Sequence, residues 1–351
     1  MPTLRVGVVG VGYWGPKLVK EFQALDDVQV QRLCDIDPEA LRTQTQQLRV
    51  PCPGAANIET LLNDTAHPVD AVVIATPPDT HFALAQTALS CGKHVFVEKP
   101  LATNPNDAAL LCALAAKNQR TLFVDHTYCH DQVIQRIQNL WRQNYLGSVQ
   151  HCQLDWFGER EKPKGPSVLW DSGPHALATL HFLNPLTKGS LSMSGVQTLS
   201  TGITATANVE VKASATAAHI HLAWMGQRWK NLPVAKAACV TLFGSKKTLC
   251  YEGSFGQRQA WITDAALSPE QWQALPEAGK KNLSRPLEDV DYRDEPLKNA
   301  CQAFVDAVRH ESLPLTDGYF GFQVVSLLHA AEQSVKTQTA QAVRYQAIPL
   351  G

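Results

Sequence analysis

Three residues of this chain have the types and spacing that acid–base chemistry needs. Lys99 follows a strand predicted over residues 94–97, while Asp171 and His175 lie four residues apart at the start of a predicted helix. Residues four apart on a helix share one face, with Cβ atoms about 5–6 Å apart. A histidine near a helix N-terminus has its pKa lowered by the helix dipole, which favours the neutral form that accepts a proton. We therefore interpret Lys99, Asp171 and His175 as candidate catalytic residues.

Each of these residues also has a purely structural interpretation. Lys99 has the pattern of a surface lysine paired with the neighbouring glutamate, a contact of little energetic weight. Asp171 has the position of a helix N-cap, and His175 that of an interior histidine with satisfied nitrogens. The choice between the interpretations depends on the strands and the helix that position these side chains.

A glycine-rich turn precedes the first predicted helix. The segment Gly10-Val11-Gly12-Tyr13-Trp14-Gly15 has the spacing GxGxxG and directly follows a strand predicted over residues 4–9. Glycines at these positions let the backbone approach a pyrophosphate, and the helix N-terminus offers N–H groups and the positive end of its dipole. This context predicts a dinucleotide site that includes Tyr13 and Trp14. The alternative is a tight turn without a ligand.

Asp35 indicates which dinucleotide the turn would bind. It ends the second predicted strand, 20 residues after Gly15, where a carboxylate accepts hydrogen bonds from the adenosine ribose and repels a 2′-phosphate. No arginine directly follows it, although Arg32 and Arg42 are near in sequence and offer a route to phosphate binding. We therefore predict NAD as the cofactor, with NADP as the less favoured alternative.

Two further segments lie at the carboxyl ends of predicted strands, where ligands of open α/β sheets bind. One runs from Ala75 to His81, and the other is Glu98-Lys99-Pro100. His81 either contacts the ligand or packs in the first turn of a helix, and Asp79 and Thr80 are residue types that cap helices. The cofactor contacts expected from these segments are Thr76, Pro77, His81, Glu98 and Lys99.

The first 125 residues alternate strand-like and helical patterns. Near-continuous apolar runs predict strands covered on both faces, as in a parallel sheet. Apolar residues three or four apart, such as Leu18 and Phe22 or Ala85 and Leu89, predict helices between them. The alternation predicts an α/β fold class, with a doubly wound Rossmann domain over residues 1–125. Its predicted strands occupy residues 4–9, 28–34, 71–75, 94–97 and 121–124.

From residue 126 onward the segments are longer and of mixed polarity, which predicts antiparallel strands with one exposed face. We expect residues 126–351 to form an α+β domain with an open, mainly antiparallel sheet that binds substrate and mediates oligomerisation. Its last helices are expected to pack back toward the first domain. The segments with this strand-like pattern span residues 148–157, 207–224, 237–243 and 247–251. The predicted helices span residues 131–144, 297–309 and 319–337. The stretch 268–295, rich in Pro, Lys, Glu and Asp, predicts a long surface loop.

Composition and charge exclude several classes of protein. The 351 residues include 31 basic and 32 acidic side chains, a net charge of −1, so neither nucleic acid nor an anionic membrane is an expected partner. No run of about 18 apolar residues occurs, so no membrane-spanning helix is predicted. The nine cysteines are scattered and form no CxxC motif, which is typical of reduced thiols in a cytoplasmic protein.

Histidine spacing does not predict a metal centre. The pairs His126/His130 and His219/His221 have spacings that could place two ligands together. Neither pair brings the third and fourth ligands that a zinc site needs. We therefore predict no metal.

The motifs, in this order, resemble those of the glucose–fructose oxidoreductase/inositol dehydrogenase/rhizopine-catabolism family, and the resemblance covers nearly the full chain. It includes the GxGxxG turn, Ala75-Thr76-Pro77 with His81, Glu98-Lys99-Pro100, Asp171-Ser172-Gly173-Pro174-His175 and the last two predicted helices. The resemblance implies that Lys99, Asp171 and His175 converge beside the nicotinamide. It further implies a cis peptide bond before Pro100, and a homodimer or homotetramer formed through the open sheet.

Within that family, the closest similarity is to nucleotide-sugar 3-dehydrogenases that act on UDP-N-acetylglucosaminuronic acid. It is carried by Gly12-Tyr13-Trp14-Gly15-Pro16, Leu169-Trp170-Asp171 and Pro174-His175, whereas Ala176 stands where that subgroup usually has Asp.

The expected function is NAD-dependent oxidation of a secondary hydroxyl of a sugar or nucleotide sugar. His175 would act as the general base, Lys99 would stabilise charge on the oxygen, and Asp171 would orient them. The alternatives are a dehydrogenase of free sugars, cyclitols or dihydrodiols, and a non-catalytic dinucleotide-binding regulator.

Overall fold

The chain divides into two compact units. The computed structural model describes residues 2–51, 54–159, 167–186, 189–197, 203–213, 216–225, 238–254, 257–343 and 345. The first unit draws on residues 1–127, 295–325 and 345–351, and the second on residues 128–294 and 326–344. The chain passes between the two units at several points, two of which fall within the 3₁₀ turn η2 (Thr127–His130) and within helix α11 (Gly318–Thr337).

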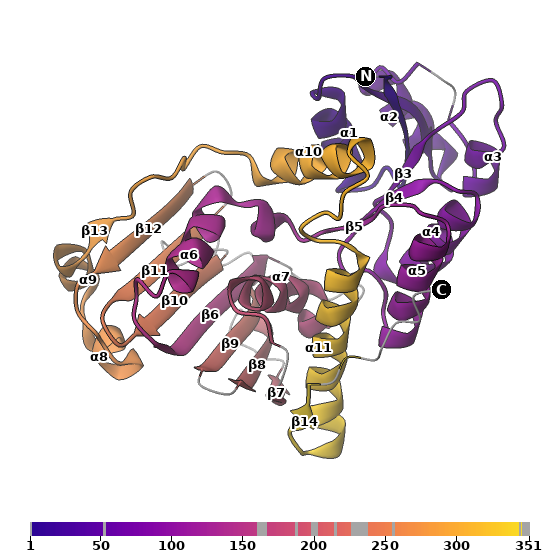
Figure 1. The fold of residues 1–351 in the computed structure, drawn as a ribbon. Coiled ribbons are helices and arrows are strands. Elements are labelled where there is room, and N and C mark those ends of the chain that lie inside the picture. The colour runs from indigo at the N-terminus through magenta and orange to yellow at the C-terminus, as the bar shows by residue number, and fades with distance from the viewer. Residues whose placement is uncertain are drawn as a thin grey trace. The chain divides into compact units, whose positions relative to one another are not determined.

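A parallel sheet of five strands forms the first unit, in the order β2-β1-β3-β4-β5. Figure 1 labels β3, β4 and β5 of this sheet. Its strands are nearly all buried because helices cover the sheet, which is why their sequences read as continuous apolar runs. The strands are β1 (Leu4–Val9), β2 (Val28–Cys34), β3 (Ala71–Ile74), β4 (His94–Glu98) and β5 (Leu122–Asp125). The α/β fold class with an N-terminal Rossmann sheet is confirmed.

The first unit takes part of its core from late in the chain. Phe304 on α10 packs edge-on against Phe22 of α1 and Phe96 of β4, with ring centroids 6.1 Å and 5.6 Å away. Helices α4 and α5 contact each other, and α4 also contacts β4 while α5 contacts β5. The helices that contribute here are α1 (Gly15–Gln23), α2 (Pro38–Gln47), α3 (Ile58–Leu62), α4 (His81–Ser90), α5 (Pro105–Lys117) and α10 (Pro296–Arg309), with the 3₁₀ turn η1 (Pro78–Thr80).

A sheet of nine strands dominates the second unit, in the order β13-β12-β11-β10-β6-β9-β8-β7-β14. All its neighbouring pairs are antiparallel except β6 and β9, which are parallel. This confirms the open, mainly antiparallel sheet. The strands are β6 (Val149–Glu159), β7 (Ser190–Gln197), β8 (Ile203–Ala213), β9 (Thr216–Met225), β10 (Ala238–Gly244), β11 (Thr248–Ser254), β12 (Gln257–Thr263), β13 (Arg285–Pro286) and β14 (Gln341–Ala342).

One face of this sheet is apolar and packs against helix α7 (Val168–Leu183), which contacts β6, β8 and β9. Leu154, Ile220 and Leu222 point to this face and are buried. Residues of the opposite face alternate with them along the strands, which is the pattern of a sheet with one polar side. Helix α6 (Gln132–Arg142) contacts α7.

One prediction about the second unit is wrong. The stretch 268–295 is not a loop throughout, because it contains α8 (Pro269–Ala274), α9 (Glu277–Leu283) and β13. Pro269 lies in the first turn of α8 and Pro276 directly precedes α9, positions where proline is tolerated, whereas Pro286 lies in β13. Ser268 forms a capping box with Gln271. The segment 207–224 contains parts of β8 and β9, which pair antiparallel as its alternation predicted.

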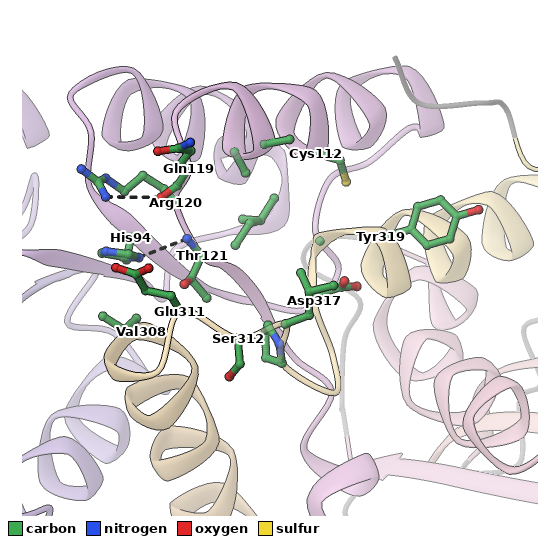
Figure 2. Close-up of a pocket in the computed structure, with 16 residues that line it drawn as sticks. His94, Cys112, Gln119, Arg120, Thr121, Val308, Glu311, Ser312, Asp317 and Tyr319 are labelled. Carbon is green, nitrogen blue, oxygen red and sulfur yellow. Dashed lines mark hydrogen bonds between the residues drawn. The ribbon is translucent and has the colours of Figure 1, made fainter. Parts of the chain in front are cut away.

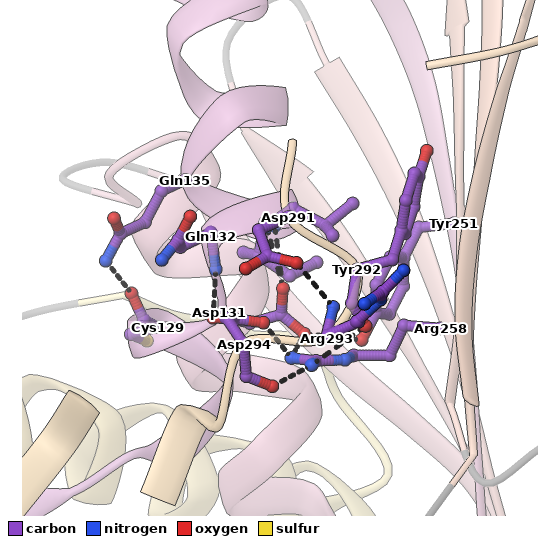
Figure 3. A network of polar contacts seen from close by, with 12 residues as sticks. Cys129, Asp131, Gln132, Gln135, Tyr251, Arg258, Asp291, Tyr292, Arg293 and Asp294 are labelled. Atoms are coloured by element: carbon purple, nitrogen blue, oxygen red, sulfur yellow. Dashed lines mark hydrogen bonds and ion pairs between the residues drawn. The ribbon is translucent and has the colours of Figure 1, made fainter. Parts of the chain in front are cut away.

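A buried ion cluster joins α6 to the outer strands of the sheet (Figure 3). Arg258 of β12 forms ion pairs with Asp131, at 3.3 Å, and with Asp294. Asp131 also caps α6 and accepts a hydrogen bond of 3.0 Å from the Tyr251 hydroxyl. Since both aspartates are at most 3% exposed, the guanidinium must compensate two desolvated carboxylates.

In the part of the chain that the structure describes, none of the helices is long and apolar enough to cross a membrane. The eight described cysteines form no disulfide with one another. Cys52 lies outside the described residues.

Candidate functional site

The glycine-rich turn between β1 and α1 has the shape that a pyrophosphate requires. Gly10 adopts φ +94°, and a Cβ built there would lie 2.5 Å from the Ala75 carbonyl oxygen. A Cβ on Gly15 would collide with the Gly10 carbonyl, whereas one on Gly12 would meet nothing within 4 Å. The strand, turn and helix are therefore packed tightly at Gly10 and Gly15, with open space over Gly12 for a ligand.

The N-terminus of α1 is available to an anion. Trp14 occupies its N-cap position without a side-chain cap, so the first N–H groups of the helix have no such partner. Lys17 brings a positive charge to the same turn, with Nζ 3.7 Å and 4.2 Å from the ring centroids of Tyr13 and Trp14. Lys17 was not among the predicted contacts, although a lysine in the first turn after GxGxxG was visible in the sequence.

Asp35 is held beside this turn by two backbone groups. Its carboxylate accepts hydrogen bonds from the N–H of Val11, at 2.7 Å, and of Asp37, at 2.9 Å. These contacts fix the carboxylate at the carboxyl end of β2. The structure thus places the predicted ribose-binding acid and the glycine-rich turn in direct contact.

His81 has a structural part in the segment after β3. Its ring is fully buried, with Nδ1 2.8 Å from the Pro100 carbonyl and Nε2 2.9 Å from the Thr76 carbonyl. Burial lowers the pKa of His81. Both nitrogens face backbone carbonyls, so His81 fixes the positions of Thr76 and Pro100 and any effect on a cofactor passes through them.

Thr76 and Pro77 lie at the end of β3, where a ligand was expected. The hydroxyls of Thr76 and Thr80 are 2.7 Å apart, and Thr80 donates to the Pro77 carbonyl at 2.7 Å. Thr80 occupies the N-cap position of α4 but makes no side-chain cap. The hydroxyl therefore braces the turn rather than the helix.

Lys99 directly follows Glu98 in the chain, and Glu98 is one of a pair of buried carboxyl groups. Glu98 and Asp125 are register partners at the ends of β4 and β5, and are 7% and 1% exposed. Burial raises the pKa of both, and the charge on Asp125 raises that of Glu98 further, while Lys99 lowers both. The Thr127 hydroxyl donates to Asp125 at 2.8 Å. The Lys99–Pro100 peptide bond is cis, as the family resemblance implies.

In the second unit, Asp171 and His175 both lie on α7. The N-cap position belongs to Ser167, so the interpretation of Asp171 as the cap is wrong. Asp171 accepts a hydrogen bond of 3.1 Å from the indole N–H of Trp224. His175 is half-buried: its ring is nearly parallel to that of Trp156 at 6.3 Å, and the Tyr128 ring meets it edge-on at 5.4 Å.

Tyr128 and Trp156 were missed by the sequence predictions. They come from η2 and β6, and their rings contact each other at 4.5 Å. Burial raises the pKa of Tyr128 to about 12, so its hydroxyl stays protonated at neutral pH. A single aromatic residue in a strand gives no sequence signal that separates site lining from core packing.

Comparison with known proteins agrees with this geometry. Residues 4–126 match the profile of an oxidoreductase family described as having an NAD-binding Rossmann fold. Over this stretch the chain is similar to that oxidoreductase family. The match covers the glycine-rich turn, Asp35, Lys99 and all five strands of the parallel sheet.

Several curated proteins are similar to part of the chain. A glycosyl hydrolase family 109 protein of Shewanella pealeana is 31% identical over 45% of this chain and 36% of its own length. A 1-carboxy-3-chloro-3,4-dihydroxycyclohexa-1,5-diene dehydrogenase of Comamonas testosteroni is 34% identical over 51% of this chain and 47% of its own. The chain thus spans about a third to a half of the length of these relatives.

A solved structure resembles the whole fold. UDP-N-acetylglucosamine 3-dehydrogenase from Acidithiobacillus ferrooxidans superimposes with a TM-score of 0.76 at 22% identity. The superposition covers 96% of this chain and 99% of that one. At this identity the likeness shows a shared fold, including the second sheet.

A pocket of about 870 Å³ lies at the opposite end of the parallel sheet from Lys99 (Figure 2). It is lined by His94 and Thr121, where β4 and β5 begin, and by Glu311 and Asp317. Burial and Arg120 lower the pKa of His94 to about 4, so this histidine is neutral at physiological pH. Because ligands of such sheets bind at the carboxyl ends of the strands, we do not assign this pocket to the cofactor.

The two predicted histidine pairs form no metal centre among the described residues. His219 lies 3.6 Å from Glu210, and His221 lies 3.8 Å from Asp155. Burial lowers the pKa of His130 to about 4. Pairing with carboxylates on an exposed face accounts for the first two histidines.

Proposed function

We propose that this chain is an NAD-dependent oxidoreductase that interconverts a secondary hydroxyl and a ketone on a sugar or nucleotide sugar. The observation that carries the proposal is the environment of His175. It is a half-buried histidine in an aromatic setting, one helical turn after Asp171, on a chain whose N-terminal unit has an NAD-binding family fold.

The dinucleotide-binding residues, His175 and Lys99 would have separate roles in the reaction. The turn at Gly10–Gly15, Lys17 and Asp35 would hold the dinucleotide, whose nicotinamide supplies hydride transfer when bound. His175 would take the hydroxyl proton, since an imidazole with a pKa near 6.5 exchanges protons at neutral pH more readily than a lysine near 10.4. Lys99 would donate a hydrogen bond to the same oxygen as negative charge develops.

Asp171 would act through its charge. With Trp224 donating to one carboxylate oxygen, the helix and the sheet fix its orientation. The carboxylate would stabilise the positive charge that His175 acquires when it takes the proton. The reverse reaction, reduction of the ketone, would use the same groups in the opposite protonation states.

Support for a nucleotide sugar comes from the dehydrogenase of Acidithiobacillus ferrooxidans, whose fold this chain shares over 96% of its length. The relative from Comamonas testosteroni supports the alternative, a cyclic diol without a nucleotide. A nucleotide-sugar panel, free sugars, cyclitols and dihydrodiols should therefore be assayed in parallel with NAD, following absorbance of the reduced nicotinamide.

The variants His175→Ala and Lys99→Met test the roles. His175→Ala should lower kcat by about 10²–10⁴-fold, the usual contribution of a general base. Lys99→Met should lower it by about 10²–10³-fold, as loss of one oxyanion donor does. His310→Ala, which alters an exposed histidine at the end of α10, is the matched control and should retain wild-type kcat and Tm.

If the chain binds NAD tightly but turns over none of these substrates with either cofactor, a non-catalytic regulator is the better description. Full activity of His175→Ala would remove the assignment of the general base.

A further inference from the structure

Two cysteines and a glutamate meet on neighbouring strands of the second unit. Strands β10 and β11 are antiparallel, with Cys239 opposite Glu252 and Thr241 opposite Cys250. This register brings the three side chains to the same face of the sheet. The Sγ atoms of Cys239 and Cys250 are 4.0 Å apart. The potential ligand atoms of Cys239, Cys250 and Glu252 all lie within 4.8 Å of one another.

The spacing of the sulfurs fits coordination to one ion. Two thiolates bound to a tetrahedral zinc at about 2.3 Å are separated by roughly 3.8 Å, close to the 4.0 Å observed. A disulfide would need the sulfurs at about 2.05 Å. The two cysteines are also diagonal neighbours rather than direct cross-strand partners. The existing side-chain positions therefore need little adjustment to bind a metal.

A small cavity adjoins two of the three side chains. It has a volume of about 30 Å³ and is lined by Cys250, Glu252, Trp261 and residues of α8 and α9, among them Trp272 and Lys280. A cavity needs roughly 10–15 Å³ to hold one water molecule. There is room for a water as a fourth ligand, under the cover of two helices.

We propose that Cys239, Cys250 and Glu252 bind a zinc-class divalent cation, with a water molecule as the fourth ligand. Two thiolates and one carboxylate favour a borderline-soft ion such as Zn²⁺ over Mg²⁺ or Ca²⁺, which prefer oxygen ligands. The ion would tie β10 to β11 on the side of the sheet that α8 and α9 cover. Its role in this position is structural, remote in sequence from Lys99, Asp171 and His175.

Binding must displace protons from the thiols. The hydrogen bond to Cys250, then burial, and then the neighbouring carboxylates Asp155 and Glu252 raise the pKa of Cys239. As each zinc–sulfur bond forms, one thiol proton leaves to water, so two protons are released and affinity rises with pH.

This site left no motif in the sequence. Zinc modules are usually found as CxxC pairs within one segment, whereas the two cysteines of this site are 11 residues apart and are aligned by strand pairing. No metal was therefore predicted from the sequence, and the register of β10 with β11 is what brings the ligands together.

The test is metal titration of the full chain. After reduction and chelator treatment, Cd²⁺ is added as a spectroscopic probe for thiolates and Zn²⁺ as the competing ion. We expect one equivalent of Cd²⁺ to give a near-ultraviolet sulfur-to-metal charge-transfer band, Zn²⁺ to remove it, and Tm to rise with either ion. Native preparations should contain close to one zinc per chain by elemental analysis.

Variants assign the ligands. Cys239→Ser should weaken Cd²⁺ binding by at least about tenfold, the scale at which even outer-shell partners act, and reduce the band. Glu252→Gln, an isosteric change at a half-buried position, should weaken Zn²⁺ binding similarly while the band per bound Cd²⁺ is retained. Cys91→Ser is the matched control, since it removes an exposed thiol at the end of α4, and it should bind both ions as the wild type does.

Three results would overturn the proposal. The first is the absence of a stoichiometric charge-transfer band in the reduced wild type. The second is unchanged affinity in both Cys239→Ser and Glu252→Gln. The third is a Cys239–Cys250 disulfide in protein prepared anaerobically with reductant, seen by peptide mass as the loss of two hydrogens.

Discussion

Asp35 combines a structural and a recognition role at the residue scale. It anchors Val11 of the glycine-rich turn, and its charge opposes a 2′-phosphate. We expect NAD to bind more tightly than NADP. The variant Asp35→Ser should reduce the difference between the two affinities and should also weaken NAD binding. Quenching of tryptophan fluorescence during titration measures both affinities. Asp37→Ser, which keeps a residue type able to cap α2, is the control, and equal affinities in the wild type would contradict the prediction.

The Glu98–Asp125 pair makes stability depend on pH. Both carboxyls have a raised pKa in the folded protein, so the folded state binds more protons than the unfolded state above about pH 4. The free energy of unfolding should therefore fall as pH rises from about 4 toward the raised pKa values. Asp125→Asn should flatten this decline and raise Tm relative to the wild type at neutral and mildly alkaline pH.

Thermal melts between about pH 5 and about pH 8 test this linkage. The Thr127 hydroxyl can still donate to the amide oxygen of Asp125→Asn, so packing is preserved. Glu39→Gln, which changes an exposed acid, should leave the pH dependence as it is. A uniform loss of Tm in Asp125→Asn would instead mean that Asp125 is ionised and stabilised by Lys99.

At the scale of elements, Arg258 links α6, β11 and the segment before α10. Replacing one partner of a buried ion cluster leaves uncompensated charge and typically costs about 3–5 kcal/mol. Arg258→Met should lower the free energy of unfolding by this amount, as measured by urea denaturation. Arg293→Met alters an exposed arginine in the same segment and should change it by less than about 0.5 kcal/mol. If both variants lost the same free energy of unfolding, the buried ion cluster would contribute no more to stability than an exposed arginine does.

Elements that are marked by a pattern within a short stretch of sequence could be predicted. The turn at Gly10–Gly15 follows a strand and opens a helix, and each of these features is readable within about 30 residues. Helices α8 and α9 were taken for a loop because short helices with prolines at their N-termini lack the periodicity of longer ones.

Features that depend on register or on burial were not predictable in the same way. The environment of His175 comes from Tyr128 and Trp156, which are brought to it by η2 and β6. His81 has the position of a ligand contact, and only its burial between two carbonyls reveals its structural role. The roles of Lys99, Asp171 and His175 stay predictions until the variants are measured.

At the scale of the whole molecule, the open face of the nine-stranded sheet is the expected oligomer interface. It carries side chains of mixed polarity, including Gln153, Asp155 and His221, around a groove of about 850 Å³. We expect a homodimer or homotetramer. The variant Gln153→Arg, near the centre of β6, should shift the oligomeric state toward smaller species. Light scattering after size exclusion measures the mass, with the exposed Gln47→Arg on α2 as control. A monomeric wild type at micromolar concentration would refute the interface.

The assembly of the first unit from distant segments has a consequence for synthesis of the chain. Phe304 completes the aromatic core around Phe22 and Phe96, yet α10 is translated long after β5 is finished. At about 5–20 residues per second, the ribosome needs roughly 10–30 s to span this interval. During that time the nascent Rossmann sheet exposes an apolar face, and a chaperone that shields it until α10 emerges would protect the chain from aggregation.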